Sequence, residues 1–260
     1  MSRDTTGSLD EAAREGLEAL LLSMADDEFV IGFWDSEWTG IAPLLEEDIA
    51  MSSLATDELG HARALYGLLG DLTARDPDAI AYDRAPEAFR HARLLDHPRT
   101  DWAFSMARRW LYDTADAVRL EALAASTYRP LADLVTKIRR EERYHLLHVD
   151  AWLRRLAGTP GEPRDRLSAA LETLRPDATS VFSPLPNGSR LVEDGIIAGS
   201  MESLADRWLV EATSILTSLA LPVPDPGADL AAGRTDHSPA FRWLWGEFTS
   251  VRRLDPAAAW

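Results

Sequence analysis

The sequence contains two copies of the pattern Glu-x-x-His, at Glu58–His61 and at Glu142–His145. On a helix, residues three apart share one face, so each carboxylate can meet a metal ion together with its imidazole. Two such motifs, with one further carboxylate from each of two other helices, form the di-iron or di-manganese centre of certain four-helix bundles. The pair of motifs therefore predicts a binuclear metal centre.

The residues around the two motifs follow the same pattern. An ordinary bundle helix keeps its charged residues on the outer face, but here each Glu and His falls inside the apolar stripe. A charge in that stripe is costly unless it is paired or bound to a metal. The matching stripes are Leu54, Glu58, His61, Leu65, Leu68 and Ile138, Glu142, His145, Val149, Trp152.

The helix before the first motif must supply a third ligand. In an antiparallel hairpin, residues that are equally far from the turn lie at the same height. Counting back from Glu58 leads to Asp27, Glu28 or Asp35. Glu28 lies in an apolar stripe with Met24 and is the preferred candidate, while Asp27 stays as the alternative.

The same count from Glu142 leads to Asp113 or Asp116. Asp113 shares a stripe with Trp110 and Leu120 and is preferred, with Asp116 as the alternative. The spacing from Asp113 to Glu142 nearly repeats the spacing in the first hairpin. The predicted catalytic and metal ligands are therefore Glu28, Glu58, His61, Asp113, Glu142 and His145.

Four carboxylates and two imidazoles form an oxygen- and nitrogen-rich ligand set. Such a set suits iron, with manganese as the alternative, better than copper or thiophilic metals. Glu58 and Glu142 are expected to bridge the two ions. Open positions on two reduced irons would bind O2, the expected co-substrate, while the protein positions the ions and excludes water.

Apolar periodicity predicts an all-α protein without strands. Long helices are expected at residues 9–38, 44–70, 101–126 and 130–157, and further helices at 163–174, 200–219 and 238–252. Ser8 is expected to cap the first helix. Residues 71–98 are expected to form a crossover with a short helix at 86–94. Two hairpins joined by a crossover predict a ferritin-like four-helix bundle with additional C-terminal helices.

We expect one domain over residues 1–260, with the bundle core at 9–157 and a C-terminal helical extension at 160–260. The formal net charge of -16 argues against nucleic-acid binding. Without any cysteine the chain has no disulfide or thiolate metal site, which fits a cytoplasmic protein. No apolar run is long enough to predict a membrane span.

Several other side chains receive a plainer interpretation. His91, His97 and His237 fall in loops or at helix starts and are assigned no role, and His148 is interpreted as an ordinary partly buried histidine. The large aromatic residues are expected to pack in the core. They include Trp34, Trp38, Trp110, Tyr112 and Tyr144.

The chain resembles the bacterial multicomponent phenylacetyl-CoA oxygenase (epoxidase) family along nearly its whole length. Five segments resemble the non-catalytic structural subunit: Ser36-Glu37-Trp38, the run 42–50, Gly60-x-Ala62-Arg63-Ala64-Leu65, Arg143-Tyr144-His145-Leu146, and the C-terminal run from Gly233 through His237 to Trp260. That subunit is ferritin-like, has typically lost its metal ligands, and serves as a scaffold for the catalytic subunit.

The chain departs from the structural subunit at the predicted metal ligands. Where that subunit tends to carry apolar or amide residues, this chain has Glu28, Glu58, His61, Asp113 and Glu142. These positions instead match the pattern of the catalytic subunit. The resemblance therefore favours Glu28 and Asp113 over their neighbours.

Together, these features predict a di-iron-dependent monooxygenase that hydroxylates, epoxidises or N-oxygenates a small organic substrate. An electron-donating reductase and either an oxygenase partner subunit or a second copy of the chain are the expected protein partners. The alternative is a non-catalytic scaffold subunit of a phenylacetyl-CoA-oxygenase-like complex.

Overall fold

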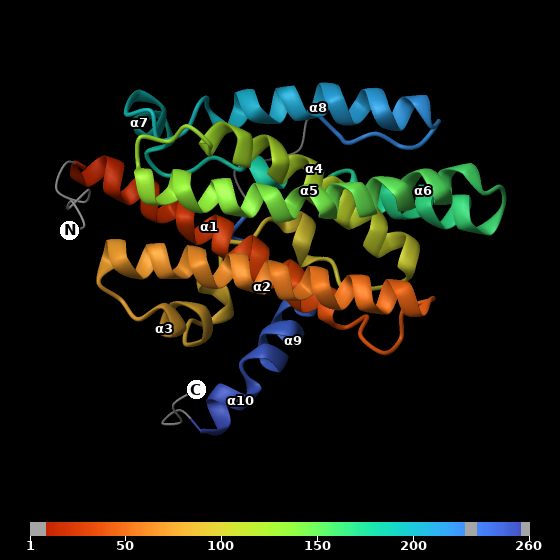
Figure 1. Ribbon diagram of the computed structural model, residues 1–260, viewed down its shortest axis with the longest axis horizontal. Helices are drawn as coiled ribbons and strands as arrows, with labels where there is room; N and C mark the ends of the chain where they lie inside the picture. The colour runs from red at the N-terminus through yellow and green to blue at the C-terminus, as the bar shows by residue number, and fades with distance from the viewer. Residues whose placement is uncertain (1–8, 227–232, 256–260) are drawn as a thin grey trace. The chain divides into compact units, whose positions relative to one another are not determined.

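The computed structural model describes residues 9–226 and 233–255, and every regular element in these ranges is a helix (Figure 1). The predicted all-α fold class is thereby confirmed. Its four long helices are α1 (Glu11–Ser36), α2 (Leu45–Thr73), α4 (Trp102–Leu123) and α5 (Arg129–Gly158). Ser8, the predicted cap of α1, lies outside the described residues.

The crossover differs from the prediction. A short helix, α3 (Pro77–Tyr82), begins after Asp76, whose side chain accepts a hydrogen bond from the Asp78 backbone, with Pro77 in the first turn. Proline is common at this position. The backbone N–H groups of a first helical turn have no partner within the helix, so proline, which lacks an N–H, loses no hydrogen bond there. The prediction of one helix at 86–94 is wrong. This region holds only two short 3₁₀ helices, η2 (Pro86–Ala88) and η3 (Arg93–Asp96).

The C-terminal half contains the additional helices that the sequence predicted: α6 (Glu162–Leu174), α8 (Met201–Ser218), and α9 (Pro239–Phe248) with α10 (Ser250–Leu254). Two short helices, η4 (Ala178–Phe182) and α7 (Gly188–Glu193), were not predicted. The helix predicted at 238–252 is divided at Thr249, which ends α9 and precedes α10.

The chain forms two compact units. Unit 1 contains the residues up to Leu20 and Thr100–Gly233, and unit 2 contains Leu21–Arg99 and the residues from Arg234 onward. Helix α1 therefore contributes its first turns to unit 1 and the rest to unit 2. The expectation of one domain over the whole chain stays a prediction.

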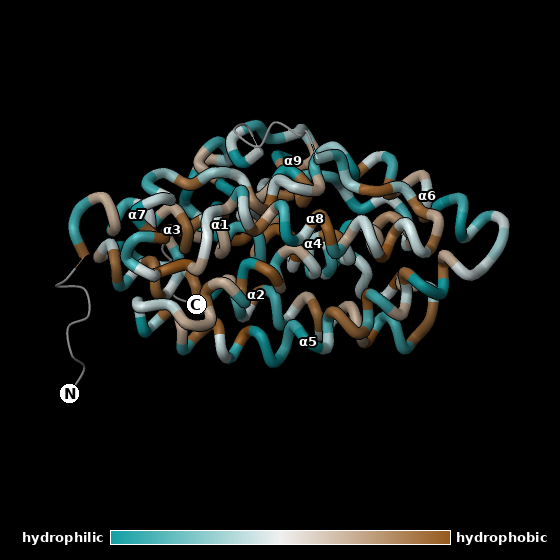
Figure 2. Tube along the Cα trace, turned by 90° about the horizontal axis from the view of Figure 1, so that it is seen from above, coloured by the Kyte–Doolittle hydropathy of each residue, from teal (hydrophilic) through white to brown (hydrophobic). Residues whose placement is uncertain are grey.

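In unit 1, helix α4 is the central element and packs against α5, α6, α8 and η4. It runs antiparallel to α5, because Trp102 meets Trp152 while Arg109, further along α4, meets the earlier residue His145. The hydropathy of α5 alternates along the helix, as its changing colours show in Figure 2. One face of α5 is therefore buried and the other is polar.

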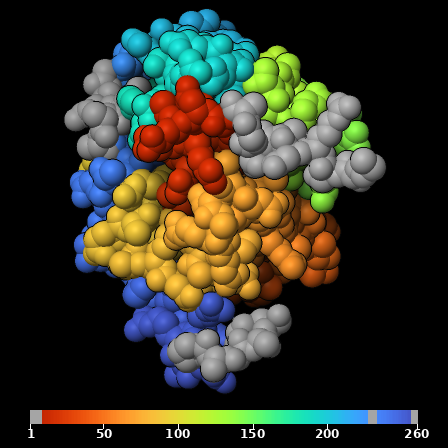
Figure 3. Space-filling view, turned by 90° about the vertical axis from the view of Figure 1, so that its left-hand side faces the viewer, coloured from red at the N-terminus to blue at the C-terminus, as the bar shows by residue number. Residues whose placement is uncertain are grey.

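In unit 2, α1 and α2 form the second antiparallel hairpin. Asp26 lies beside Tyr66, Glu28 beside His61, and Gly32 beside Glu58. Helix α3 packs against α2, and Figure 3 shows their neighbouring surfaces in yellow and orange. The C-terminal segment joins this unit, where the Trp245 indole donates to the Arg84 carbonyl at 3.0 Å.

The two central helices are buried almost all round. Every residue of α1 from 23 to 32 and of α4 from 103 to 113 is buried. Such burial contributes roughly 1.5–3 kcal/mol for each large apolar side chain. Trp34, Trp38, Trp110 and Tyr112 are in this core as predicted. The prediction for Tyr144 is wrong, because its side chain lies on the outer face of α5 and is 68% exposed.

Candidate metal centre

Unit 2 brings three predicted ligands together. Glu28 on α1 faces Glu58 and His61 on α2, and their ligand atoms lie within 4.8 Å of one another. His61 Nδ1 is 3.4 Å from Glu28 Oε2 and 3.6 Å from Glu58 Oε2. The three residues are 0–4% exposed. The apolar stripe of α2 therefore carries the motif inward, as the sequence predicted.

The orientation of His61 suits a metal ion. Its Nδ1 faces two carboxylate oxygens, and in the neutral ring this nitrogen is either a donor or a lone pair. A lone pair beside two carboxylates requires a cation, either a proton or a metal ion, to offset the repulsion in a buried site. Carboxylate oxygens and an imidazole nitrogen are ligands that suit iron and manganese.

Unit 1 holds the other three predicted ligands. In α5, His145 Nδ1 lies 3.0 Å from Glu142 Oε1, and both side chains are nearly fully buried. The two motifs therefore have the same internal arrangement, with Nδ1 turned toward the Glu of its own motif. Asp113 on α4 is fully buried as well.

Arg109 connects Asp113 to His145 and was not predicted. Its guanidinium lies 3.1 Å from Asp113 Oδ1 and 3.4 Å from His145 Nδ1. The side chain is 0% exposed. Arg109 and Asp113 are four residues apart on one helix, a spacing that favours ion pairs, and this spacing was the available signal in the sequence. A protein cation therefore already contacts two of the predicted ligands.

The alternative ligands have other partners. Asp27 accepts hydrogen bonds from the Arg234 guanidinium at 2.8 Å and from the Ala92 backbone at 2.7 Å. Asp116 pairs with Arg119 at 2.5 Å. These contacts give Asp27 and Asp116 structural roles, and they support the choice of Glu28 and Asp113, which stays a prediction.

A second buried acid of α1 organises the polar contacts next to the triad. Asp26 accepts hydrogen bonds from the Tyr66 hydroxyl at 2.6 Å, from Arg84 at 2.5 and 2.9 Å, and from the Arg90 backbone at 2.6 Å. Burial, followed by the charge of Asp26, raises the pKa of Tyr66 well above its ordinary value. Tyr66 thus stays a protonated donor that fixes α2 against α1.

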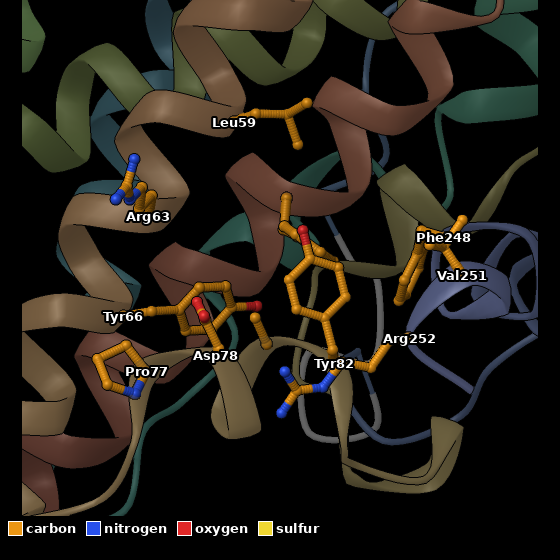
Figure 4. A pocket seen from close by; sticks show the side chains of 11 residues that line it. Leu59, Arg63, Tyr66, Pro77, Asp78, Tyr82, Phe248, Val251 and Arg252 are labelled. Carbon is orange, nitrogen blue, oxygen red and sulfur yellow. The ribbon is translucent and has the colours of Figure 1, made fainter. Parts of the chain in front are cut away.

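A cavity of about 550 Å³ lies in unit 2 and is lined by residues of α1, α2, α3, α9 and α10 (Figure 4). Aromatic and apolar residues form much of its wall, with Arg63 and Arg252 adding positive charge. Phe29 and Leu59 in this wall directly follow the predicted ligands Glu28 and Glu58. The cavity has the volume of a small-molecule site.

Comparison with known proteins identifies the family. The chain matches the family model described as phenylacetic acid catabolic protein over residues 3–260. It therefore belongs to this family, which is part of the ferritin-like superfamily. The resemblance and the fold class predicted from the sequence are both confirmed.

Two relatives are different subunits of 1,2-phenylacetyl-CoA epoxidase from Escherichia coli (strain K12). The chain is 27% identical over 246 residues to the C subunit, covering 94% of this chain and 99% of that protein. It is 25% identical over 220 residues to the A subunit, covering 83% of this chain and 71% of that relative. Similarity thus extends to two different components of one enzyme.

In the described part of the chain, no helix is both long and apolar enough to cross a membrane. The cytoplasmic location stays a prediction.

Proposed function

We propose that the protein is a non-haem di-iron oxygenase that activates O2 to hydroxylate, epoxidise or N-oxygenate a small organic substrate. The observation that carries this proposal is the buried triad of Glu28, Glu58 and His61, with His61 Nδ1 3.4 and 3.6 Å from the two carboxylates. Two acids and an imidazole in an apolar interior form a costly arrangement. A bound metal ion would offset this cost by pairing with the carboxylates and the imidazole.

The proposed centre takes ligands from both hairpins. Glu28 and His61 would hold one ion, Asp113 and His145 would hold the other, and Glu58 and Glu142 would be ligands shared by both. When bound, the two irons supply the electrons and the open positions for O2 chemistry. The chain holds the ligands on four rigid helices, balances the charge of the ions with four carboxylates, and excludes water from the buried centre.

Arg109 has a defined part in this proposal. It neutralises Asp113, because its guanidinium lies 3.1 Å from that carboxylate. Binding of the second ion requires Arg109 to leave Asp113 and His145. Metal loading and movement of Arg109 are therefore linked.

The substrate and partners are proposed from the relatives. Their names specify 1,2-phenylacetyl-CoA epoxidase, so phenylacetyl-CoA is the first compound to test on this chain. A reductase would supply two electrons for each O2, and an oxygenase partner subunit or a second copy of the chain would complete the complex. The proposed substrate and partners rest on sequence similarity to the epoxidase subunits and on the predicted metal ligands.

A scaffold subunit is the second candidate function, and two observations favour it. The C subunit of the epoxidase is matched over 99% of its length, compared with 71% for the A subunit. The contacts of Arg109 with Asp113 and His145 also offer a stable arrangement without a second metal. In this case the chain would bind a catalytic partner and catalyse nothing itself.

Metal content and reaction with O2 separate the two candidates. The protein is reconstituted anaerobically with Fe²⁺, desalted and analysed for iron, and its oxidation is followed on admission of O2. An oxygenase binds two irons per chain and oxidises them, and with a reductase it forms an oxygenated product. A chain that binds no iron and associates with a catalytic subunit is a scaffold, and oxidation without any organic product indicates iron storage.

Glu58→Ala provides the site-specific version of this test. It removes a bridging ligand, so metal binding should be lost while association with a partner subunit persists. Asp57→Ala is the matched control, because the neighbouring acid on α2 is only partly buried. Equal iron content in Glu58→Ala and the parent protein would contradict the proposed centre.

A further inference from the structure

Two histidines to which the sequence assigned no role meet at one aspartate in unit 2. His91 and Asp96 belong to the crossover, before and within η3, and His237 lies just before α9. The side chains of His91, Asp96 and His237 are 0%, 6% and 4% exposed, respectively. Residues far apart in the sequence thus form a buried cluster separate from the Glu28–Glu58–His61 triad.

The separations in this cluster match those of a metal site. Asp96 Oδ1 is 3.0 Å from His91 Nε2 and 3.5 Å from His237 Nδ1, and the three residues offer ligand atoms that lie within 4.8 Å of one another. With metal–ligand bonds of roughly 2.0–2.2 Å, adjacent ligands of a tetrahedral zinc ion lie roughly 3.3–3.6 Å apart. The two distances to Asp96 therefore suit a shared ion, once one imidazole has rotated.

The tautomer of His237 supports the same assignment. Its Nε2 lies 3.0 Å from the Phe89 carbonyl, and only a protonated nitrogen can donate to that oxygen. In the neutral ring, Nδ1 then presents a lone pair to the carboxylate of Asp96, which is favourable only with a cation, either a proton or a metal ion, between them. A carbonyl on the far nitrogen is the common partner of a metal-bound histidine.

The remaining contacts hold the ligands in place. The rings of His91 and His237 stack with centroids 4.3 Å apart and an angle of 15° between their planes, so one ring must rotate out of the stack for both nitrogens to bind one ion. Asp96 Oδ2 accepts a hydrogen bond from the Ser238 backbone at 2.5 Å, which leaves Oδ1 toward the two imidazoles. Ligands fixed in advance lose less entropy on binding.

We propose that His91, Asp96 and His237 form a second metal site, which takes one divalent transition-metal ion of the zinc class. Two imidazoles and one carboxylate with a fourth position for water are ligands typical of zinc. The ion joins the crossover to the C-terminal segment. The assignment is independent of the proposed oxygenase centre, because no ligand is shared.

Metal binding at this cluster would stabilise one wall of the cavity in unit 2. Phe89, whose carbonyl holds His237, packs against Phe241 at 5.3 Å and Phe248 at 5.7 Å between ring centroids. Phe248 lines the cavity together with Val251 and Arg252. A metal ion at this site would therefore fix a segment that lines the cavity.

The test is a titration with Co²⁺ or Zn²⁺ in the chain carrying Glu58→Ala and Glu142→Ala, which removes both proposed bridging ligands. We expect about one equivalent of metal to bind, with the Co²⁺ absorption of a tetrahedral nitrogen and oxygen site. Adding His237→Asn or His91→Asn should weaken binding at least about 100-fold, since even outer partners of metal ligands contribute 10–100-fold. His97→Asn is the matched control from the same loop and should not change the affinity.

Absence of metal binding in the double variant, or equal affinity after His237→Asn, would overturn the proposal. Circular dichroism of the metal-free variants checks that they are folded. If a variant fails to fold, X-ray absorption at the zinc edge of the unsubstituted chain decides. Two imidazoles and one carboxylate at a single zinc ion support the site, and a shell without imidazole rules it out.

Discussion

Arg109 sets the charge on the unit 1 side of the proposed centre. Its guanidinium is buried beside Asp113 and His145, so a second divalent ion would meet a positive charge there. Two unit charges about 4 Å apart repel by about 4 kcal/mol at an effective dielectric constant of 20. We therefore predict that Arg109→Gln raises the affinity for the second metal equivalent at least about 10-fold in an anaerobic Fe²⁺ titration.

Arg119→Gln is the control for this prediction. Arg119 is also buried in α4, but it pairs with Asp116, which is not a preferred ligand. Both substitutions remove a buried cation and should destabilise the fold by roughly 3–5 kcal/mol. Only Arg109→Gln should change the metal stoichiometry, and equal binding curves for the two variants would contradict the role of Arg109.

Asp26 is the acid whose loss should affect the fold most directly. Its carboxylate accepts hydrogen bonds from Tyr66, Arg84 and the Arg90 backbone. Asp26→Asn leaves the mostly buried Arg84 without its anion and should lower the free energy of unfolding by roughly 3–5 kcal/mol in urea. Glu37→Gln breaks the partly exposed pair with Arg99 and should cost less than about 1 kcal/mol. A smaller loss for Asp26→Asn than for Glu37→Gln would refute this role of Asp26.

Side-chain roles were predictable only where the pattern is local. The burial of Glu58, His61, Glu142 and His145 follows from their positions in apolar stripes, and the structure confirms it. The role of Asp27 was not predictable, because its partner Arg234 lies 207 residues away. His237 was missed for the same reason.

Among the elements, the close approach of α1 and α2 positions the triad. A Cβ at Gly32 would lie 3.1 Å from both Glu58 Cβ and Leu59 Cγ. Gly32→Ala should push α2 away at the height of Glu58 and weaken the first metal equivalent by about 10-fold, or roughly 1.4 kcal/mol. The same titration with Mn²⁺ measures this change without oxidation of the ion.

Gly67→Ala controls for helix propensity. Gly67 also lies in α2, but a Cβ there meets nothing within 4 Å. Alanine favours a helix by about 1 kcal/mol over glycine, so this variant should be slightly more stable and bind Mn²⁺ normally. Unchanged Mn²⁺ binding in Gly32→Ala would show that the helices have room to separate.

The long helices were predictable because periodicity accumulates over many turns. Helices α2 and α5 begin and end close to the predicted residues. The crossover was harder to predict, because short helices depend on local caps such as Asp76 with Pro77 at the start of α3. Helix α1 is continuous over Glu11–Ser36 although it carries the buried acids Asp26 and Asp27, because distant arginines neutralise them.

At the scale of the whole molecule, the predicted ligands divide equally between the two compact units. Glu28, Glu58 and His61 belong to unit 2, whereas Asp113, Glu142 and His145 belong to unit 1. A centre with two bridging carboxylates would couple the units through its metal ions. Two independent metal sites would instead stabilise each unit separately, so the dependence of each unit on metal distinguishes the arrangements.

Hydrogen exchange with and without Mn²⁺ tests this coupling. A ligand that binds only the folded state stabilises it by about 2.7 kcal/mol at a concentration 100 times its Kd. For the proposed centre, amides around Glu58 in α2 and around Glu142 in α5 should become protected at the same Mn²⁺ concentration. Amides of α8 should change least, because none of the six predicted ligands is on that helix.

Glu58→Ala makes the outcome decisive, because it alters unit 2 alone. If Glu58 bridges the two ions, the substitution should abolish Mn²⁺ protection in α5 as well as in α2, although α5 keeps Glu142 and His145. Protection of α5 that persists in Glu58→Ala would show that unit 1 binds metal independently. The six-ligand centre would then have to be replaced by two separate three-ligand sites, and a shared O2-activating centre would lose its basis.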